Sequence, residues 1–380
     1  MVSIGPVTLN APFFEAGLAG YSDTAMRLIA RRHGCPYCVT EAMLDVFLLQ
    51  GGKGLKAAEL DEADHPIAGQ LMGSHAPDMA QGAGVLRSLG YDVIDLNFAC
   101  PVKKIRKRCR GGHLLSAPDE AIAMLDAVRQ RIGDDLPCTV KLRRGSDDSA
   151  DAEANFHRIF EKVIELGYAA AVVHGRTVEQ KYVGPSRWSF LQRVVKQYGG
   201  AGNFVIGGSG DIWQAADIFT MIEQTGVQLV SVARGCIGNP WVFAQARALL
   251  CGDEQAGSRP PTIFEQRQVL LEHFDLSMKL HGQKRASLMM RKFGIKFSRH
   301  HHDADQVRAA FINVKSLDDW TGVIEVYYRQ DGPGRVADRG PADATNESCQ
   351  SASSETAGGE LPVAKRRSIE PTPADASYQS

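Results

Sequence analysis

The feature that most restricts the fold of this 380-residue chain is a repeated alternation of short apolar runs with longer amphipathic segments. The longer segments have the apolar spacing of helices. In 118–132, for example, Ala121, Met124, Leu125 and Val128 recur every one to four residues on one face. The short runs, which have the length of buried strands, are 16–19, 37–40, 67–72, 93–97, 139–142, 170–174, 204–207 and 229–233.

Strands that alternate with helices are expected to run parallel. Eight such units fit a closed (β/α)8 barrel, the TIM barrel, of about 250 residues. An open, doubly wound α/β sheet is the alternative, but no Gly-x-Gly-x-x-Gly motif follows the first strand. The predicted helices are 23–33, 77–89, 118–132, 151–166, 188–198, 212–225 and 240–250, with a short one at 43–50.

The pattern changes after the barrel. Residues 254–261 are polar and end in two prolines, which is typical of a linker. Residues 331–380 nearly lack large apolar side chains, so we expect a disordered tail. The sequence thus predicts a barrel at 1–253, a small all-α domain at 254–330 and the tail at 331–380. The helices of the all-α domain are expected at 262–281, 284–300, 303–312 and 317–328.

Composition excludes several classes of protein. The net charge is −1 and 44% of residues are hydrophobic, as in an ordinary globular chain whose basic patches are local. No apolar run approaches the roughly 18 residues of a membrane span, and residues 1–5 lack a signal-peptide pattern. The eight cysteines are scattered, so we expect a reduced, cytoplasmic protein with no membrane or stable protein partner.

The clearest chemical signal lies just after the fourth predicted strand, where Asn97 is followed by Cys100 and Pro101. A thiol at a strand end can act as a nucleophile or a proton donor, and adjacent positive charge suits a polyanionic substrate. We therefore expect an enzyme that modifies a nucleic-acid base; a buried structural cysteine beside a solvated basic face is the alternative. The basic residues that follow are Lys103, Lys104, Arg106, Lys107, Arg108 and Arg110.

Polar residues stand at nearly every predicted strand end, which is where the active site of such a barrel forms. Any one of them alone could be a capping or surface residue. Together they are notable, because the interior positions of barrel strands are otherwise apolar. They are Glu41, Gln70, Asn97, Lys141, Arg143, His174, Arg176, Ser209, Asp211 and Arg234.

The last two strands end in glycine-containing turns, at 207–211 and at 233–235. Glycines let backbone N–H groups approach an anion, and a helix that begins at Ile212 would offer its positive end. We expect a phosphate-bearing ligand here, because these loops are the common phosphate site of the fold. Two tight turns without a ligand are the alternative, and the glycines do not separate a flavin phosphate from a sugar phosphate. If the ligand is a flavin, its ring could contact Gln70, Lys141 and His174.

Residues 276–302 of the helical part contain no Asp or Glu, and three histidines end this region at 300–302. Such a balance predicts a phosphate-binding surface, with a solvated basic face as the alternative. We expect the histidines to form a cationic helix end rather than a metal site. The basic residues of the region are Lys279, Lys284, Arg285, Arg291, Lys292, Lys296 and Arg299.

A second candidate metal site is the Cys35-Pro36-Tyr37-Cys38 motif, which His33 precedes. No second cysteine pair stands at a matching spacing nearby, so we expect no zinc here and no metal site in the chain.

Together these motifs resemble the tRNA-dihydrouridine synthases over about residues 16–243. The most specific piece is 97–101 with Lys103 and Lys104, which is similar to the catalytic signature of that family. Residues 290–292 and the basic helices around them resemble its tRNA-binding domain. The other matching pieces, in chain order, are 18–23 with Arg27, 40–43, 68–71, 140–143, 173–177, 210–212, 233–235 and 238–241.

The chain departs from the family pattern at four places. Gly17 stands where the family usually has Pro, and Ala99 replaces a usual Gly. Cys109 and Arg110 replace a Gly-Ala-like pair in the loop expected to cover the target base. Ser209 stands where Asn is common, which affects one expected hydrogen bond to the cofactor.

The resemblance implies an FMN enzyme that reduces the C5–C6 bond of a tRNA uridine, with NADPH or NADH reducing the flavin. Hydride would reach C6, Cys100 would protonate C5 from the opposite face, and the base would have to be flipped out of the RNA. The expected cofactor-binding residues are Gln70, Lys141, His174, Ser209, Gly210, Asp211, Ala233, Arg234 and Gly235. The expected substrate-binding residues are Asn97, Arg143, Arg176, Lys103, Lys104, Arg291 and Lys292. Lys141, Arg143 or Arg176 could hold either the uracil carbonyls or the flavin.

Two alternatives differ in their substrate or in their chemistry. A dihydroorotate-dehydrogenase-like flavoprotein would share the barrel, FMN and the cysteine but act on a free pyrimidine, which needs no basic helical domain. A non-catalytic RNA-binding protein would not need Cys100, Lys141 and His174 together.

Overall fold

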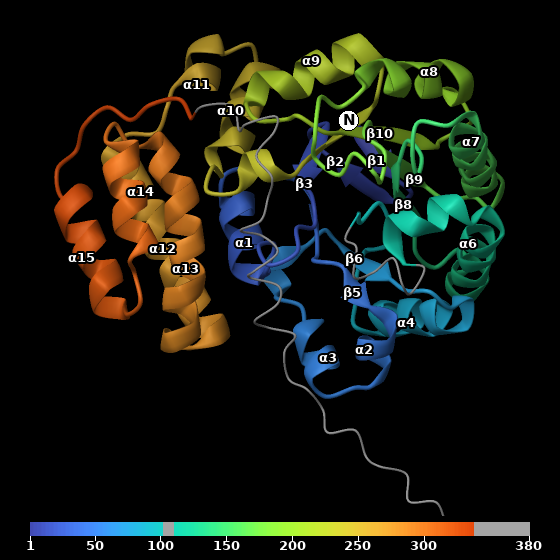
Figure 1. The fold of residues 1–380 in the computed structure, drawn as a ribbon, viewed down its shortest axis with the longest axis horizontal. Coiled ribbons are helices and arrows are strands. Elements are labelled where there is room, and N and C mark those ends of the chain that lie inside the picture. The colour runs from blue at the N-terminus through green and yellow to red at the C-terminus, as the bar shows by residue number, and fades with distance from the viewer. Residues whose placement is uncertain (102–109, 338–380) are drawn as a thin grey trace, which may run out of the picture. The chain divides into compact units, whose positions relative to one another are not determined.

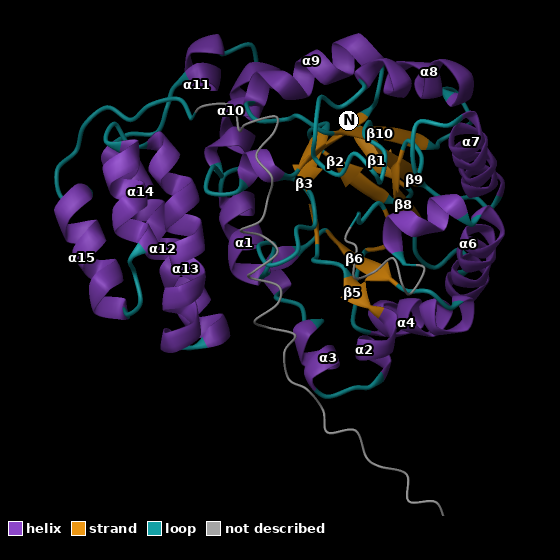
Figure 2. Ribbon diagram, in the orientation of Figure 1, coloured by secondary structure: helices purple, strands orange, loops and turns teal. Residues whose placement is uncertain are grey.

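Eight parallel strands form a closed barrel in the computed structural model, which describes residues 1–101 and 110–337. The ring closes because β3 pairs with β11 and with β4, and β4 pairs with β6. The predicted TIM barrel is therefore confirmed, and the open sheet is wrong (Figures 1 and 2). The barrel strands are β3 (Phe13–Glu15), β4 (Cys38–Val39), β6 (Ile67–Met72), β7 (Val93–Phe98), β8 (Cys138–Arg143), β9 (Ala170–His174), β10 (Val205–Ser209) and β11 (Leu229–Val232). A short strand, β5 (Met43–Leu44), pairs with the end of β6.

The first barrel strand lies three residues before its predicted position at 16–19. The apolar stretch is longer than one strand, and its second half turns: Leu18 O accepts hydrogen bonds from the backbone N–H groups of Tyr21 and Ser22. The preceding hairpin of β1 (Val2–Ile4) and β2 (Val7–Leu9) was not predicted. Its Ile4 and Leu9 join the buried core of residues from the barrel strands, at the start of the strands rather than at their carboxyl ends.

Helices surround the barrel (Figure 1). In α6, for example, the apolar stripe from Ala121 to Val128 is buried against the sheet, and Gly133 at φ 60° ends the helix as expected. Among the helices in the described ranges, none is long and apolar enough to span a membrane. The helices after the strands are α1 (Thr24–Arg32), α4 (Ala76–Ser88), α6 (Pro118–Ile132), α7 (Ala150–Glu165), α8 (Trp188–Tyr198), α9 (Ala215–Thr225) and α10 (Trp241–Leu250), with short helices α2 (Asp45–Leu49) and α3 (Lys53–Ala57).

Four further helices pack together beside α1 and α10 (Figure 1). Aromatic rings join them to the barrel: Trp241 meets Phe297 at 5.7 Å between ring centroids, and Tyr21 meets Phe293 at 5.6 Å. The described residues therefore belong to one compact unit, although the boundary predicted at 253/254 stays a prediction. The helices are α12 (Ile263–His281), α13 (Gln283–Phe297), α14 (Ala304–Ile312) and α15 (Leu317–Tyr327).

Two segments predicted as irregular are ordered. The expected linker begins with a short helix, α11 (Glu254–Ser258), whose first turn is capped by the Asp253 carboxylate. Residues 331–335, expected in the disordered tail, bond to the helical part: Gly332 O accepts from Ile263 N, and Arg335 N donates to His300 O. Amino-acid composition does not predict these contacts, because they are hydrogen bonds between backbone groups. Residues 338–380 lie outside the described part.

Candidate active site

A chain of hydrogen bonds crosses three neighbouring strands beneath Cys100. Thr139 on β8 donates to Asp95 on β7 (2.6 Å), and the amide nitrogen of Gln70 on β6 donates to the other oxygen of Asp95 (2.7 Å). Gln70 in turn accepts a bond from the amide nitrogen of Asn97 (2.7 Å). Burial raises the pKa of the Asp95 carboxyl, while the bonds from Thr139 and Gln70 oppose that change. The chain fixes the Gln70 and Asn97 side chains before any ligand binds.

Asn97 also shapes the turn that presents Cys100. Its side-chain oxygen accepts bonds from the backbone N–H groups of Ala99 and Cys100, both at 3.0 Å. The thiol is partly exposed, as a proton donor to a substrate has to be. Asn97 was predicted to bind substrate, which stays a prediction, and both ends of its amide bond to protein groups. Asp95 was missed, although an acidic residue inside an apolar strand run was a visible signal.

The segment that returns after the basic loop packs directly on Cys100. Gly112 N donates to Cys100 O at 3.0 Å, and a side chain at Gly111 (φ +58°) would place its Cβ 3.0 Å from the Cys100 Cβ. Arg110 was predicted in the basic surface run, but it is buried, with Nη2 3.8 Å from the buried Asp45 carboxylate. Lys103, Lys104 and Cys109 lie outside the described residues.

Three predicted cofactor residues meet at the ends of β8, β9 and β10. Lys141 Nζ donates to Ser209 Oγ at 2.7 Å, and His174 Nδ1 lies 3.2 Å from the same oxygen. Burial, together with the nearby Arg143, lowers the pKa of Lys141 to about 7. Burial also holds the pKa of His174 well below its usual range, and the charges of four neighbouring cations add to this effect. Burial and the neighbouring cations therefore both disfavour the protonated forms of Lys141 and His174.

Arg176 and Asp211 form an ion pair beside this group. Arg176 is fully buried, and its Nη2 donates to both carboxylate oxygens of Asp211 at 2.7 and 2.9 Å. Asp211 holds a left-handed backbone (φ +61°) and also accepts a bond from Ser186 N at 2.7 Å. Both residues were predicted to touch a ligand, which stays a prediction; each also bonds to protein groups, Arg176 to the carbonyl of Gly184 among them.

The turns after β10 and β11 lie against each other as predicted. A Cβ at Gly235 would stand 2.2 Å from Ile212 O, so only glycine fits there. The helix after β10 does not start at Ile212: α9 begins at Ala215, and its N-terminus is capped by Gln214 and Asp217. An anion in these turns would consequently meet the turn backbone and Arg234 rather than an open helix end.

Arg234 stands between two aromatic rings that sequence reasoning missed. Its guanidinium lies 4.9 Å from the Tyr182 ring centroid and 4.8 Å from that of Trp213, with one-fifth of the side chain exposed. Its Nη2 is also 3.8 Å from Asp211. The rings fix the direction of the cation without neutralising its charge.

Arg143 is placed to organise loops. Its Nε donates to Ala99 O at 2.7 Å, beside Cys100, and its Nη1 donates to the carbonyls of Thr177 and Lys181. Burial lowers the pKa of Arg143 to about 10, which leaves it charged at neutral pH. Three backbone carbonyls therefore already accept hydrogen bonds from the guanidinium group that was predicted to contact the substrate.

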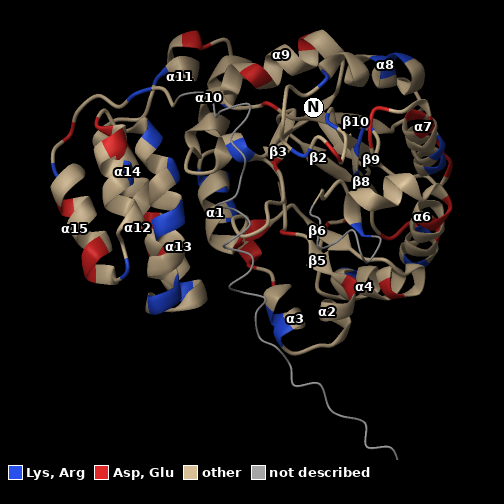
Figure 3. Ribbon diagram, viewed as in Figure 1, with Lys and Arg blue, Asp and Glu red and all other residues tan. Residues whose placement is uncertain are grey.

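The helical part contacts the loop after β3, at the carboxyl end of the barrel (the barrel mouth), through α13. Lys292 Nζ donates to Gly20 O at 2.7 Å and covers the Tyr21 ring, while Gly20 N donates to Glu41 at 2.8 Å. Arg291 is half-buried, in contrast to the exposed Lys284 and Arg285. Figure 3 shows the Lys and Arg segments that run along α13.

The histidines at 300–302 differ in their burial, and both cysteines of the 35–38 motif are buried. His300 is buried beside Trp241, and burial lowers its pKa to about 3, so the predicted cationic cluster at 300–302 is wrong. His301, His302 and Asp303 each offer one possible ligand atom, and these atoms lie within 4.8 Å of one another. The Cys35 and Cys38 thiols are buried 4.0 Å apart, and among the described residues they join no third ligand in such a group.

Comparisons with known proteins agree with the geometry. The family profile described as dihydrouridine synthase (Dus) matches residues 15–326. A probable tRNA-dihydrouridine synthase from Rhodobacter capsulatus is 30% identical over 303 residues, which cover 79% of this chain and 87% of that protein. One from Treponema pallidum is also 30% identical, over 85% of this chain and 95% of that protein. The tRNA-dihydrouridine synthase B of Shewanella oneidensis is 27% identical over 86% and 98%.

Among solved structures, histamine dehydrogenase from Rhizobium sp. 4-9 superposes with a TM-score of 0.51 at 14% identity, over 71% of this chain. The chain spans about half the length of that protein (50%), and at this identity the likeness concerns the fold alone. The profile match over most of the chain decides the family. With the barrel, the Cys100 turn and the cationic strand ends in place, the chain belongs to the dihydrouridine synthase family, whose members are flavin-dependent oxidoreductases.

Proposed function

We propose that this protein is a cytoplasmic tRNA-dihydrouridine synthase that reduces the C5–C6 bond of a uridine in tRNA, with FMN as cofactor and NADPH or NADH as reductant. The observation that carries the proposal is the cationic end of the barrel beside a partly exposed cysteine. The family and the names of the curated relatives support the choice of tRNA as the substrate.

The residues at the ends of β8 to β11 fit the anionic cofactor. Four cations surround His174 (Lys141, Arg143, Arg176 and Arg234), whereas Asp211 is the acid bonded among them. Such an excess of positive charge is costly to bury unless an anion shares the site. Arg234 and the backbone of the 233–235 and 209–211 turns would hold the phosphate. Lys141 and His174 would face the ring, since they meet at Ser209.

When bound and reduced, FMN would supply hydride chemistry at C6 of the uracil. The Cys100 thiol would donate its proton to C5, where the negative charge would develop. The Asn97 side chain holds the backbone of Cys100 in place for this transfer. Arg143 fixes the carbonyl of Ala99 next to it, and so stiffens the same turn from the other side.

A uridine in folded tRNA has to leave its stack to reach this site. The cations of α13 lie on the element that contacts the first barrel loop through Lys292. We propose that these cations hold the RNA backbone while the base enters the mouth.

The test uses the purified full-length protein and tRNA that lacks dihydrouridine. We expect an oxidised-flavin absorbance near ~450 nm and formation of dihydrouridine in the presence of NADPH, with none when FMN is removed. A colourless protein that gains no spectrum on addition of FMN would contradict the cofactor assignment. A flavoprotein that reduces a free pyrimidine such as orotate but not tRNA would instead favour the dihydroorotate-dehydrogenase-like alternative.

A further inference from the structure

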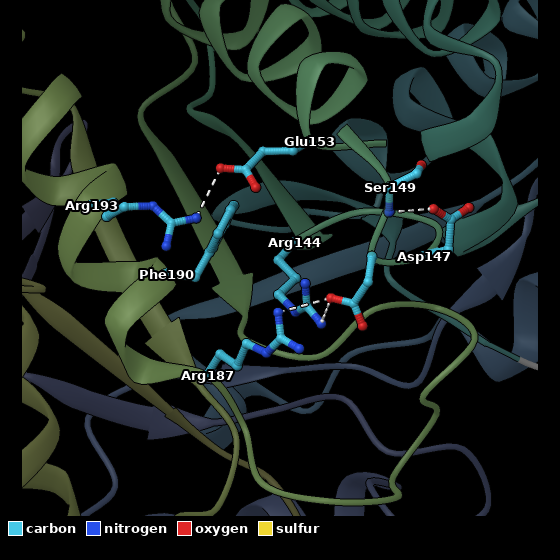
Figure 4. A pocket seen from close by; sticks show the side chains of 8 residues that line it. Arg144, Asp147, Ser149, Glu153, Arg187, Phe190 and Arg193 are labelled. Atoms are coloured by element: carbon cyan, nitrogen blue, oxygen red, sulfur yellow. Dashed lines mark hydrogen bonds and ion pairs between the residues drawn. The ribbon is translucent and has the colours of Figure 1, made fainter. Parts of the chain in front are cut away.

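A small pocket lies at the rim of the barrel, outside the group of residues described above (Figure 4). Its walls come from the loop after β8 with the start of α7, and from the start of α8. Arg144 directly follows Arg143, and Arg187 follows Ser186, whose backbone binds Asp211. Both walls of the pocket therefore contain an arginine that is adjacent in sequence to a residue of the proposed active site. Its lining residues are Arg144, Asp147, Asp148, Ser149, Glu153, Arg187, Phe190 and Arg193.

Two guanidinium groups in this pocket converge on a single carboxylate oxygen (Figure 4). Oδ1 of Asp148 lies 2.5 Å from Nη2 of Arg144 and 2.9 Å from Nη1 of Arg187. The Nε of Arg144 is buried and has no hydrogen-bond partner among residues 1–101 and 110–337. One oxygen cannot satisfy two planar guanidinium forks. The pocket also contains Asp147 and Glu153, but Asp147 accepts a bond from Ser149 N and Glu153 pairs with Arg193, so neither acid supplies an acceptor for the Arg144 Nε.

Arg144 is buried, whereas the side chains of Arg187 and Asp148 are half-exposed. Only 6% of the Arg144 side chain is exposed, and its Nη2 also donates to Gln180 at 2.8 Å. Arg187 and Asp148 are about half exposed, at 54% and 49%. An ion pair this exposed contributes little to stability, so a stronger anion can replace the carboxylate. A phosphate group brings more oxygen acceptors and suits paired guanidinium groups better than one carboxylate oxygen does.

We propose that Arg144 and Arg187 form a binding site for a backbone phosphate of the substrate RNA, and that Asp148 occupies this site until the RNA arrives. The proposal rests on the proposed function, because it takes tRNA as the substrate. It adds a contact on the α7–α8 side of the mouth, separate from the cations of α13. In this arrangement Asp148 lowers the affinity for RNA, since it competes with the phosphate for the same donors.

The test compares Arg187→Gln, Asp148→Asn and Arg193→Gln in the full-length, FMN-loaded protein. Arg193 lines the same pocket and is similarly exposed, but it pairs with Glu153 instead of Asp148, so it serves as the matched control. The dissociation constant for unmodified tRNA is measured from low to moderate salt. The KM for NADPH is measured in parallel, because its ribose phosphate is a second possible source of the same chemistry.

Arg187→Gln should weaken tRNA binding roughly three- to tenfold and flatten the log–log salt dependence by about 0.7–0.9, the contribution of one phosphate. Asp148→Asn should tighten binding and leave the slope as steep or steeper, and Arg193→Gln should change neither. The control Arg193→Gln should also keep the parent rate of tRNA reduction at saturating tRNA.

The proposal is overturned if Arg187→Gln binds tRNA like the parent, if Arg193→Gln weakens binding equally, or if only the KM for NADPH changes. Each of these results leaves the proposed function standing, provided that the parent protein still reduces tRNA. A parent protein that neither binds nor reduces tRNA would refute the proposed function itself.

Discussion

The barrel mouth and the outer surface of α13 are both rich in Lys and Arg, but they hold these residues in opposite ways. At the mouth, Lys141 is half-buried and Arg143 is buried, and desolvation lowers the pKa of the first to about 7 and of the second to about 10. On α13, Lys284 and Arg285 are exposed to solvent. Burial of a cation costs free energy, and packing fixes the position of its side chain. Each buried cation should therefore have its own measurable effect on the binding of a ligand. Exposed cations are screened, so they should act together on a long polyanion and depend on salt.

The substitution Cys100→Ala should have the largest effect of any at the barrel mouth, because it removes the proposed proton donor. Loss of general acid catalysis should lower the rate of tRNA reduction by about 10²–10⁴-fold. FMN content and NADPH oxidation should stay normal, because other residues carry those steps. Cys251→Ala, an exposed cysteine after α10, is the control. Reduction of tRNA at the parent rate by Cys100→Ala would remove this cysteine from the mechanism and direct attention to Cys109.

Arg234→Ala should give the next largest effect. Removal of one charge-assisted hydrogen bond should weaken FMN binding by about 1.5–3 kcal/mol, measured by fluorescence titration of the FMN-free protein. Arg158→Ala removes an exposed arginine on α7 and should leave FMN binding unchanged. Equal effects of the two substitutions would mean that net charge, and not a positioned cation, attracts the cofactor.

The double variant Lys284→Gln/Arg285→Gln tests the other region. We expect weaker tRNA binding and a salt slope that is flatter by about 0.7–0.9 for each phosphate that the variant no longer binds, with unchanged FMN content. Arg158→Gln/Lys162→Gln makes the same charge change on the outer face of α7. Lys292 is avoided because its removal would also break its bond to Gly20. A tRNA affinity and slope equal to those of the parent would exclude this end of α13 from the RNA surface.

The smallest effect concerns pH. The pKa of Lys141 is lowered on folding, from a usual value of 10.5 to about 7. The unfolded chain therefore binds more protons between these values, and the folded state gains stability from this group as pH rises through that window. Urea unfolding of the FMN-free protein should show Lys141→Met more stable relative to the parent at pH 7 than at pH 9. If this difference is the same at both pH values, Lys141 is not buried as a titrating group.

The sequence was most informative where residue pattern and burial coincide. The strands at 67–72 and 170–174 were predicted with their observed bounds, because the first run is buried throughout and the second as far as Val173, and turn residues flank both. The first strand was misplaced because the apolar run continues into a turn that backbone hydrogen bonds define. The ordered residues 331–335 were missed for the same reason, since polar composition says nothing about where backbone groups find partners.

For the candidate site, the sequence identified which residues meet but not what each one does. Gln70, Asn97, Lys141, His174 and Ser209 were all predicted at strand ends, and the structure brings them into hydrogen-bonded groups. Whether such a side chain faces a ligand or a neighbouring carbonyl depends on three-dimensional loop paths. Arg143 and Arg176 were predicted to hold substrate, which stays a prediction, and the loop paths give both residues protein partners as well. Asp95 was missed because we expected the interior of the strand to be apolar.

The hairpin of β1 and β2, at the end of the barrel where the strands start, has a consequence for folding during synthesis. Ile4 and Leu9 contact a core built from seven of the eight barrel strands, the last of which contributes Leu229. These two residues leave the ribosome more than two hundred positions before that partner exists. Their native neighbours are complete only when the ring has closed, so the earliest part of the chain should be among the last to acquire its protection from solvent exchange.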